Sequence, residues 1–425
     1  MSKAGSRSRK VAAVGAVVAL VAGCGSSKGT ANSTPASAGS SGTSAGASSS
    51  GKTITIGVLE DKTGLGSSGN GTMDLGVAAG KALATAAGFN VKVVIGDTQT
   101  SPAATLAAAH KLVDQDHVDV VLAESAVTFA AAPYLTQQGI PVVGVAQDAG
   151  EWITSPNMFP DVGYLDVTKV STTTGLFMKS QGVTTVGSIG YSISPSSADA
   201  ARATGISAQA VGLKVGTIES SFPFGGTNVQ PVALAMKNSG TDGFTAEVDP
   251  NTGFALVAAL RQLNATPKVA LLATGYGGDL LQAGPAALQD AQGLYFTTSF
   301  QPVEMHTAAT QKFEAALKAA GVSGEPTYAE YNGYASMALL VQGLQGDGGS
   351  LSHAALIASL GKITNFDAAG LLGSHTLNLN DRAASAVGID GGCTYITKLQ
   401  GKTFNLVPGA EPICGQEIPG KSAAA

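Results

Sequence analysis

The stretch TITIGVLEDKTGLGSSGNGT, residues 53–72, runs from a β-rich segment through a glycine-rich loop to the start of a helix. Its GLGSSG segment, residues 64–69, matches the G-x-G-x-x-G pattern of a dinucleotide-binding loop. In that loop the first glycine follows the strand directly, because the turn must bring the helix N-terminus under the pyrophosphate. Here EDKT separates the strand end near Leu59 from Gly64, and its two carboxylates would repel a pyrophosphate. The stretch therefore predicts an α/β unit that binds no nucleotide.

Two interpretations of the glycine-rich loop remain open. Backbone N–H groups at the start of the helix near Thr72 could face an anionic group of a ligand, helped by the positive end of the helix dipole. The loop could equally be a flexible connection that contacts no ligand.

The chain beyond this stretch alternates strand and helix. Two sets of β-rich runs are separated by Ala-rich helical stretches such as 73–87 and 103–114. Such alternation is typical of parallel sheets covered by helices on both faces, and 425 residues suffice for two domains. The expected strands are 53–59, 91–97, 118–123 and 141–145 in the first set, and 184–191, 213–219, 243–248 and 269–273 in the second.

The N-terminus has the pattern of an export signal. Four basic residues precede the apolar run 11–22, which is too short for a stable membrane span. The run ends in LVAGC, residues 20–24, which resembles a bacterial lipobox. We expect a signal peptide over 1–23 and lipidation of Cys24; an ordinary signal peptide with a chance cysteine is the alternative. Residues 24–51, rich in Ser and Gly, predict a flexible tether with a reach of roughly 30 Å.

The C-terminal third departs from simple alternation. After residues 294–298 the pattern turns helical over 328–344 and 353–360, and a Gly-rich, strand-like tail follows. The chain is therefore expected to cross between its lobes more than once. Cys393 and Cys414 in the tail form an even pair in an exported chain, which predicts a disulfide that stabilises the fold by about 3 kcal/mol.

Composition and motifs argue against several classes of function. The net charge is −5 and no basic patch is interleaved with aromatic residues, so we expect no nucleic-acid partner. The five histidines are scattered without metal spacing, and no G-x-S-x-G motif occurs. We therefore expect no enzyme activity, no catalytic residue, no metal and no cofactor. A pair of carboxylates that meets only in space stays open as an alternative.

Loops after the strands hold the candidate ligand-binding residues. In an open α/β sheet the ligand lies beyond the carboxyl ends of the strands. Ser125 could instead cap the helix that follows it, and Asp148 could pair with a lysine or face solvent. The candidates are Ser67, Ser125, Ala146, Asp148, Tyr191, Asp249 and Tyr276.

Taken together, these features resemble a known family. The segments ITIGVLEDKTGLGSSGNGTMDLGVAAGKALA and VDVVLAESAVTFAAAPYLTQQGIPVVGV are similar to those of type I periplasmic binding proteins of the leucine/isoleucine/valine-binding group, the solute receptors of ABC importers. The resemblance covers about residues 52–385 and implies two Rossmann-like lobes joined by three crossovers, which close on a solute by a hinge motion. It places lobe 1 at 52–163 plus about 299–375, and lobe 2 at 164–298 plus about 376–425.

The resemblance also implies roles for the candidates. It places the receptor of a ligand carboxylate at Ser125, and a carbonyl and a threonine hydroxyl at Ala146 and Asp148. Asp148 departs from the pattern, because an aspartate would bind an ammonium group through a charge-assisted bond. The aromatic and acidic residues of the second lobe fall on Tyr191, Asp249 and Tyr276. The glutamate expected near Tyr276 is absent, which counts against an α-amino-acid ligand.

The resulting expectation is an extracytoplasmic solute-binding lipoprotein. It would be a monomer, anchored to the bacterial cell membrane through Cys24, that delivers a small polar or amphipathic solute to an ABC permease. A sensory receptor that uses the same fold is the alternative.

Overall fold

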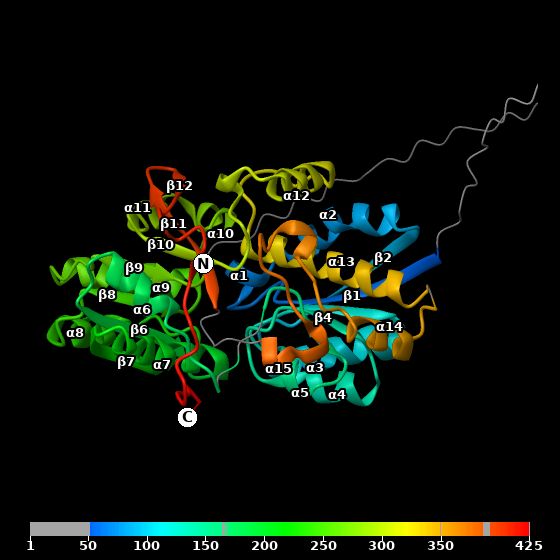
Figure 1. Ribbon diagram of the computed structural model, residues 1–425, viewed down its shortest axis with the longest axis horizontal. Coiled ribbons are helices and arrows are strands. Elements are labelled where there is room, and N and C mark those ends of the chain that lie inside the picture. The colour runs from blue at the N-terminus through cyan, green and yellow to red at the C-terminus, as the bar shows by residue number, and fades with distance from the viewer. Residues whose placement is uncertain (1–51, 164–165, 167, 349, 386–391, 425) are drawn as a thin grey trace, which may run out of the picture. The chain divides into compact units, whose positions relative to one another are not determined.

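The computed structural model describes residues 52–163, 166, 168–348, 350–385 and 392–424 (Figure 1). The expected signal peptide, Cys24 and the tether lie outside these residues. The described chain is an α/β protein with two sheets, as expected. Within the described residues, no helix combines the length and the apolar composition that a membrane crossing requires.

The first sheet has five parallel strands in the order β2-β1-β3-β4-β5. Its side chains belong to two hydrophobic cores, one on each face of the sheet. Ile56 and Val58 belong to one core, whereas Val121 and Ala123 belong to the other. Both faces are covered by helices, so the central strands are buried and rich in Val, Ile and Leu. The strands are β1 Lys52–Glu60, β2 Phe89–Asp97, β3 Val120–Glu124, β4 Val142–Gly144 and β5 Met158–Pro160.

Helices pack on the two faces of this sheet (Figure 1). Two of them, α2 and α13, approach closely because glycines meet at their contact. A Cβ on Gly76 would lie 2.1 Å from the carbonyl oxygen of Glu330, and one on Gly333 would lie 2.2 Å from that of Met73. One face carries α2 Met73–Ala86, α12 Ala308–Ala319, α13 Tyr328–Gly346 and α14 His353–Leu360; the other carries α3 Pro102–His110, α4 Ala132–Gln137 and α5 Glu151–Thr154.

The second sheet is mixed and has eight strands within the described residues. Strands β6 to β10 are parallel, whereas β11 runs antiparallel to β10, β12 and β13. The order is β12-β11-β10-β9-β8-β6-β7, with β13 beside β11. The bounds are β6 Thr185–Tyr191, β7 Lys214–Phe222, β8 Gly243–Glu247, β9 Val269–Leu272, β10 Tyr295–Thr298, β11 Cys393–Gln400, β12 Thr403–Leu406 and β13 Ile413–Cys414.

Helices also cover the second sheet, and the chain passes three times between the sheets, after β5, after β10 and before β11. The returning tail is what makes the second sheet mixed.

Cys393 and Cys414 are direct partners in the β11–β13 ladder, and their sulfurs are bonded. The remaining α-helices are α1 Ser67–Asn70, α6 Thr173–Ser180, α7 Pro195–Ala210, α8 Gln230–Asn238, α9 Pro250–Gln262, α10 Gly278–Gln282, α11 Gly284–Asp290 and α15 Arg382–Ser385.

Candidate solute-binding cavity

A cavity of about 480 Å³ lies at the carboxyl ends of the parallel strands and is lined by both lobes. This is the position that an open α/β sheet predicts for a ligand. The first lobe contributes residues that follow β3, β4 and β5, and the second contributes residues that follow β6, β8, β9 and β10. The lining includes Gly66, Asn70, Ala126, Ala146, Gln147, Tyr191, Ser196, Phe224, Glu247, Asp249, Tyr328, His375 and Cys393.

Tyr191 and Asp249 form a joined pair in the wall of the second lobe. Asp249 is the N-cap of α9, and one of its carboxylate oxygens accepts the N–H groups of Asn251 at 2.9 Å and Thr252 at 3.2 Å. Its other oxygen accepts the Tyr191 hydroxyl and the Thr252 hydroxyl. Burial, and then the nearby Asp249, raise the pKa of Tyr191, so this phenol stays protonated and donates.

An aromatic wall adjoins this pair. The Phe224 ring meets the Tyr191 ring edge-on, with 4.8 Å between the ring centroids. Both rings line the cavity, as does Tyr328 at the start of α13. The second lobe therefore offers the solute an apolar surface next to a carboxylate.

Ser125 is fully buried and turns away from the cavity toward Asp61. Its hydroxyl donates to Asp61 Oδ1 at 2.5 Å and accepts the Val127 N–H at 3.1 Å. It thus joins the interior network at the ends of β1 and β3. The neighbouring Ala126 lines the cavity instead.

Ala146 lines the cavity, whereas the side chain of Asp148 is buried in the first lobe. The Asp148 carboxylate accepts the Phe129 N–H at 2.6 Å and the Trp152 indole N–H at 3.2 Å. Burial, followed by the neighbouring Glu151, raises its pKa well above the usual range. The backbone carbonyl of Asp148 accepts the Ser196 N–H of α7 at 3.1 Å, so this loop contacts the second lobe through its main chain.

Ser67 and Tyr276 lie outside the cavity lining. The Ser67 hydroxyl donates to the Gly64 carbonyl at 2.8 Å. The Tyr276 hydroxyl donates to Glu304 at 2.5 Å and accepts the Val303 N–H at 3.2 Å. The structure therefore brings Ala146, Tyr191 and Asp249 together in the wall, and it directs the other four candidate side chains into the interior or along their own loops.

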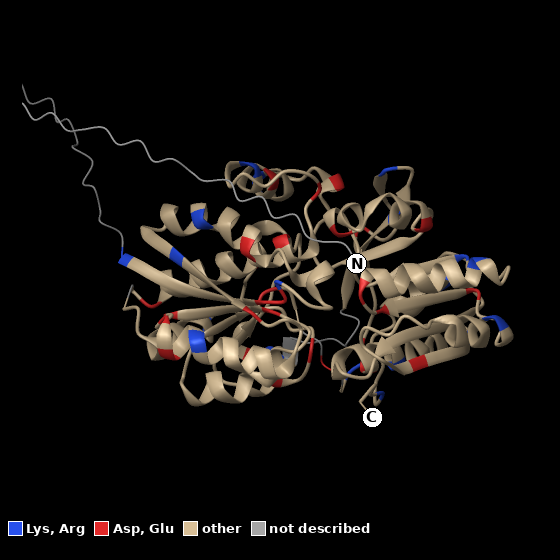
Figure 2. Ribbon diagram, turned by 180° about the vertical axis from the view of Figure 1, so that it is seen from behind, with Lys and Arg blue, Asp and Glu red and all other residues tan. Residues whose placement is uncertain are grey.

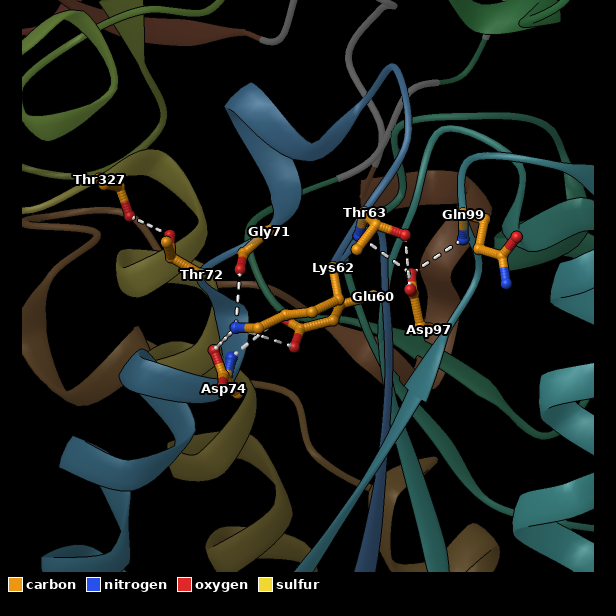
Figure 3. Close-up of polar contacts among 9 residues, drawn as sticks. All are labelled: Glu60, Lys62, Thr63, Gly71, Thr72, Asp74, Asp97, Gln99 and Thr327. Atoms are coloured by element: carbon orange, nitrogen blue, oxygen red, sulfur yellow. Dashed lines mark hydrogen bonds and ion pairs between the residues drawn. The ribbon is translucent and has the colours of Figure 1, made fainter. Parts of the chain in front are cut away.

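Polar contacts fasten the loop between β1 and α2 (Figure 3). Lys62 donates to Asp74 at 2.7 Å and to the Gly71 carbonyl at 2.9 Å, and lies 3.6 Å from Glu60. The Asp74 N–H donates to Glu60 at 3.1 Å. Burial and the nearby Asp74 raise the pKa of Glu60 to about 7, although Lys62 opposes the shift. The loop is therefore held at both of its ends by contacts within the first lobe.

Several lining residues have no individual signal in the sequence. Asn70 lies inside the glycine-rich loop and could have been proposed from its place. Phe224 follows an edge strand, and Tyr328 opens a helix far along the chain from the other lining residues. Only the fold brings these two rings to the cavity.

One group of side chains has the composition of a soft-metal site. Among the described residues, the ligand atoms of His375, Cys393 and Cys414 lie within 4.8 Å of one another. The two sulfurs are bonded to each other, so they offer no thiolate to a metal.

Comparison with known proteins decides the family. The family model described as "Periplasmic binding protein" matches residues 53–403. The chain belongs to this family. A search of curated proteins returned no match. The family consists of binding proteins, and the resemblance to type I periplasmic binding proteins is thereby confirmed.

Solved structures of this family share the fold. A solute-binding protein of an ABC transporter from R. palustris, in complex with 4-hydroxybenzoate, matches with a TM-score of 0.70 and 19% identity over 86% of this chain and 97% of the other. The branched-chain amino acid transporter substrate-binding protein of Streptococcus pneumoniae, in complex with isoleucine, matches with a TM-score of 0.67 and 18% identity over 86% and 99%. A leucine-binding protein from Thermotoga maritima matches with a TM-score of 0.65 and 17% identity over 84% and 97%.

Proposed function

We propose that this periplasmic binding protein captures a small polar or amphipathic solute in the cavity and delivers it to an ABC permease. One observation carries the proposal: both lobes line a single cavity at the carboxyl ends of their strands. A solute held there would contact both lobes and so favour the closed arrangement. The similar structures that were solved with 4-hydroxybenzoate or isoleucine support a solute of that size.

We assign the ligand contacts to Ala146, Tyr191 and Asp249. The other four candidates, Ser67, Ser125, Asp148 and Tyr276, would act by holding the loops that carry the wall. The lobes would comprise 52–163 plus about 299–375, and 164–298 plus about 376–425, in accord with the sheets to which these strands belong.

Binding without catalysis fits the state of the polar groups in the wall. The Tyr191 hydroxyl and the Asp249 carboxylate are hydrogen-bonded to each other, and Asp249 also caps α9. Asp249 also accepts the Thr252 hydroxyl, so its oxygens are occupied by contacts that hold the wall and the start of α9. The family to which the chain belongs consists of binding proteins. We therefore propose that the chain is not an enzyme.

We further propose that the protein is exported as a lipoprotein. The signal over 1–23 would be removed, Cys24 would carry the lipid anchor, and the tether 24–51 would let a monomeric binding domain reach a permease in the same membrane. The Cys393–Cys414 disulfide would form after export.

A screen of melting temperature against amino acids, aromatic compounds, sugars and polyamines tests the proposed function. A solute at a hundredfold excess over its dissociation constant stabilises the folded chain by about 2.7 kcal/mol. We expect at least one such solute, and we expect Ala146→Trp, which fills the cavity wall, to abolish its effect. Gln138→Trp, at an exposed position at the end of α4, is the control and should keep the effect. Stabilisation that survives Ala146→Trp would place the site elsewhere.

A further inference from the structure

Asp61 lies behind the first-lobe wall of the cavity and accepts hydrogen bonds from several segments of that lobe. This residue follows β1 and is fully buried. It accepts the Ser125 hydroxyl at 2.5 Å, the Ala126 N–H at 3.1 Å and the Asn70 amide at 2.8 Å. The Thr98 hydroxyl donates to it as well. Four donors from three separate loops therefore converge on one carboxylate that belongs to the chain.

These donors sit directly behind the cavity wall. Asn70 and Ala126 both line the cavity, yet the Asn70 amide and the Ala126 N–H donate inward to Asp61. Gly66, another lining residue, covers the carboxylate so closely that a Cβ there would lie 2.4 Å from Asp61 Oδ2. The Asn70 amide and the Ala126 N–H are therefore already used by Asp61 and do not point at a solute in the cavity.

Two other acidic side chains also accept backbone N–H groups. Asp148 accepts the N–H of Phe129, a residue in the segment that follows β3. Asp249 accepts the N–H groups of Asn251 and Thr252 at the start of α9. Backbone donors of the kind that hold an anion are therefore satisfied by the chain in both lobes.

No lysine or arginine lines the cavity among the described residues, although His375 does. The acidic residues Glu247 and Asp249 also line it. The internal segments outside the described residues, 164–165, 167, 349 and 386–391, contain no Lys or Arg. Lys62 is engaged by Asp74, Glu60 and the Gly71 carbonyl (Figure 3). Figure 2 shows acidic segments gathered near the middle of the ribbon, and most basic segments farther out.

We propose that Asp61 serves as a built-in carboxylate that fills the anion-receiving donors, so that the cavity selects an uncharged or cationic solute over one that carries a carboxylate. This inference rests on the proposed function. An anionic solute would lose its hydration in a wall that holds Glu247 and Asp249 and, among its described residues, no Lys or Arg, and the donors that Asp61 occupies would be closed to it. The unpaired polar atoms of Gln147, Ser196 and His375 that also line the cavity can hydrogen-bond an uncharged hydroxyl or carbonyl as well as an anion. An alcohol of the same shape carries no charge to desolvate, and attraction to Glu247 and Asp249 offsets the desolvation cost of an ammonium group.

Chemical rescue tests the role of Asp61 without knowledge of the natural solute. Asp61→Ala vacates the donors, and formate is a free carboxylate small enough to replace the missing group. We expect formate to raise the melting temperature of Asp61→Ala above its value in chloride at equal ionic strength, with no such rise in the wild type. Asp97→Ala is the control, because Asp97 accepts hydrogen bonds from Thr63 and Gln99 on the exposed side of the same loop. Equal responses in wild type and Asp61→Ala would overturn the proposal.

A second measurement uses only the wild type, and so decides the matter even if Asp61→Ala does not fold. Melting temperatures are compared at equal concentrations of 4-hydroxybenzoate, 4-hydroxybenzyl alcohol and tyramine, and of isoleucine and isoleucinol. We expect neither carboxylate to stabilise more than its alcohol or amine counterpart, and affinities to differ by about tenfold or more wherever binding is measurable. Stronger stabilisation by either carboxylate would refute the charge preference while leaving solute binding intact. Failure of every solute in the wider screen would instead count against the proposed function.

Discussion

The two walls of the cavity use their carboxylates differently. In the first lobe Asp61 and Asp148 are fully buried and hold loops through hydrogen bonds to their own chain. In the second lobe Asp249 and Glu247 reach the cavity surface beside the rings of Tyr191 and Phe224. The first wall thus uses its acidic side chains to hold loops, whereas the second presents them to the cavity. We infer that the acidic groups a solute meets come from the second lobe.

Removal of one acidic side chain from each lobe should give the largest difference between the two lobes. Asp148→Ala leaves the Phe129 N–H and the Trp152 indole N–H without their acceptor, at about 1 to 3 kcal/mol for each buried donor. We expect a free energy of unfolding lower by about 2 to 6 kcal/mol and an unchanged solute affinity. Asp249→Ala should cost about 1 kcal/mol as a lost N-cap and weaken solute binding. Urea denaturation and calorimetry measure both effects. A variant Asp148→Ala that stays stable but loses affinity would reverse the assignment.

The pH dependence of stability should also differ between the lobes. Burial raises the pKa of Glu60 and of Asp161 in the first lobe to about 7, from 4.5 and 3.8. Both groups bind a proton more tightly in the folded chain than in the unfolded chain. Their contribution to the free energy of unfolding is therefore complete below the unfolded-state pKa, and it is lost as the pH rises through 7. The expected loss between about pH 5 and pH 8 is on the order of 3 kcal/mol for each group.

Asp242 in the second lobe should act at the other end of the pH scale. Burial opposes the shift, but Lys268 and the Thr184 and Thr185 N–H groups lower its pKa to about 2. Its contribution is present above the unfolded pKa and is lost as the pH falls from about 4 toward 2. Urea denaturation at a series of pH values measures these effects. Glu60→Gln and Asp161→Asn should reduce only the loss of stability between pH 5 and pH 8, and Asp242→Asn should reduce only the loss between pH 4 and pH 2. A wild-type protein whose free energy of unfolding rises from pH 5 to pH 8 would contradict the prediction for Glu60 and Asp161.

The disulfide is expected to stabilise only the second lobe. Cys393 and Cys414 are 21 residues apart, and a loop of that length is worth about 3 kcal/mol in the chain-entropy model. The Cys393→Ser, Cys414→Ser double variant should therefore unfold about 3 kcal/mol more easily. Wild type in dithiothreitol should match it. Peptide mapping without reductant gives the direct evidence, and two free thiols in exported protein would exclude the bond.

The smallest expected effects concern helix packing at Gly76 in the first lobe and at Gly205 in the second. Gly76→Ala places a methyl group 2.1 Å from the Glu330 carbonyl oxygen, so the α2–α13 contact must open, at about 1 to 3 kcal/mol. Gly205→Ala in α7 of the second lobe meets its nearest neighbour, Ile218, at an ordinary 3.4 Å. That change should be neutral or stabilising by up to about 1 kcal/mol, because alanine favours helix. Thermal denaturation of both variants checks the contrast, which fails if they behave alike.

The strand and helix pattern predicted much of the fold. Alternating runs predicted two parallel arrangements, because buried parallel strands leave continuous apolar segments in the sequence. The antiparallel return of β11 against β10 was beyond such reasoning, since direction depends on where the chain re-enters the sheet. The prediction of a strand-like tail said nothing of its partner.

The site was predictable in position but not in side-chain direction. Asp249 could be located because a residue between a strand and a Pro-initiated helix becomes an N-cap at the strand end. Ser125 also lies at a strand end, yet its hydroxyl points to Asp61, 64 residues away in the chain. Tyr276 likewise turns toward Glu304. Such orientations are decided by long-range partners that no local pattern encodes.

Isothermal titration calorimetry of the mature chain is the most direct test of solute capture between the lobes. The titrant is the solute that most raises the melting temperature in the screen, and the same titration is run on Ala146→Trp. We predict one binding site per chain in the wild type, and no measurable heat of binding in an Ala146→Trp protein that unfolds at the wild-type temperature. Equal affinity in the two proteins would contradict the cavity as the site of solute capture.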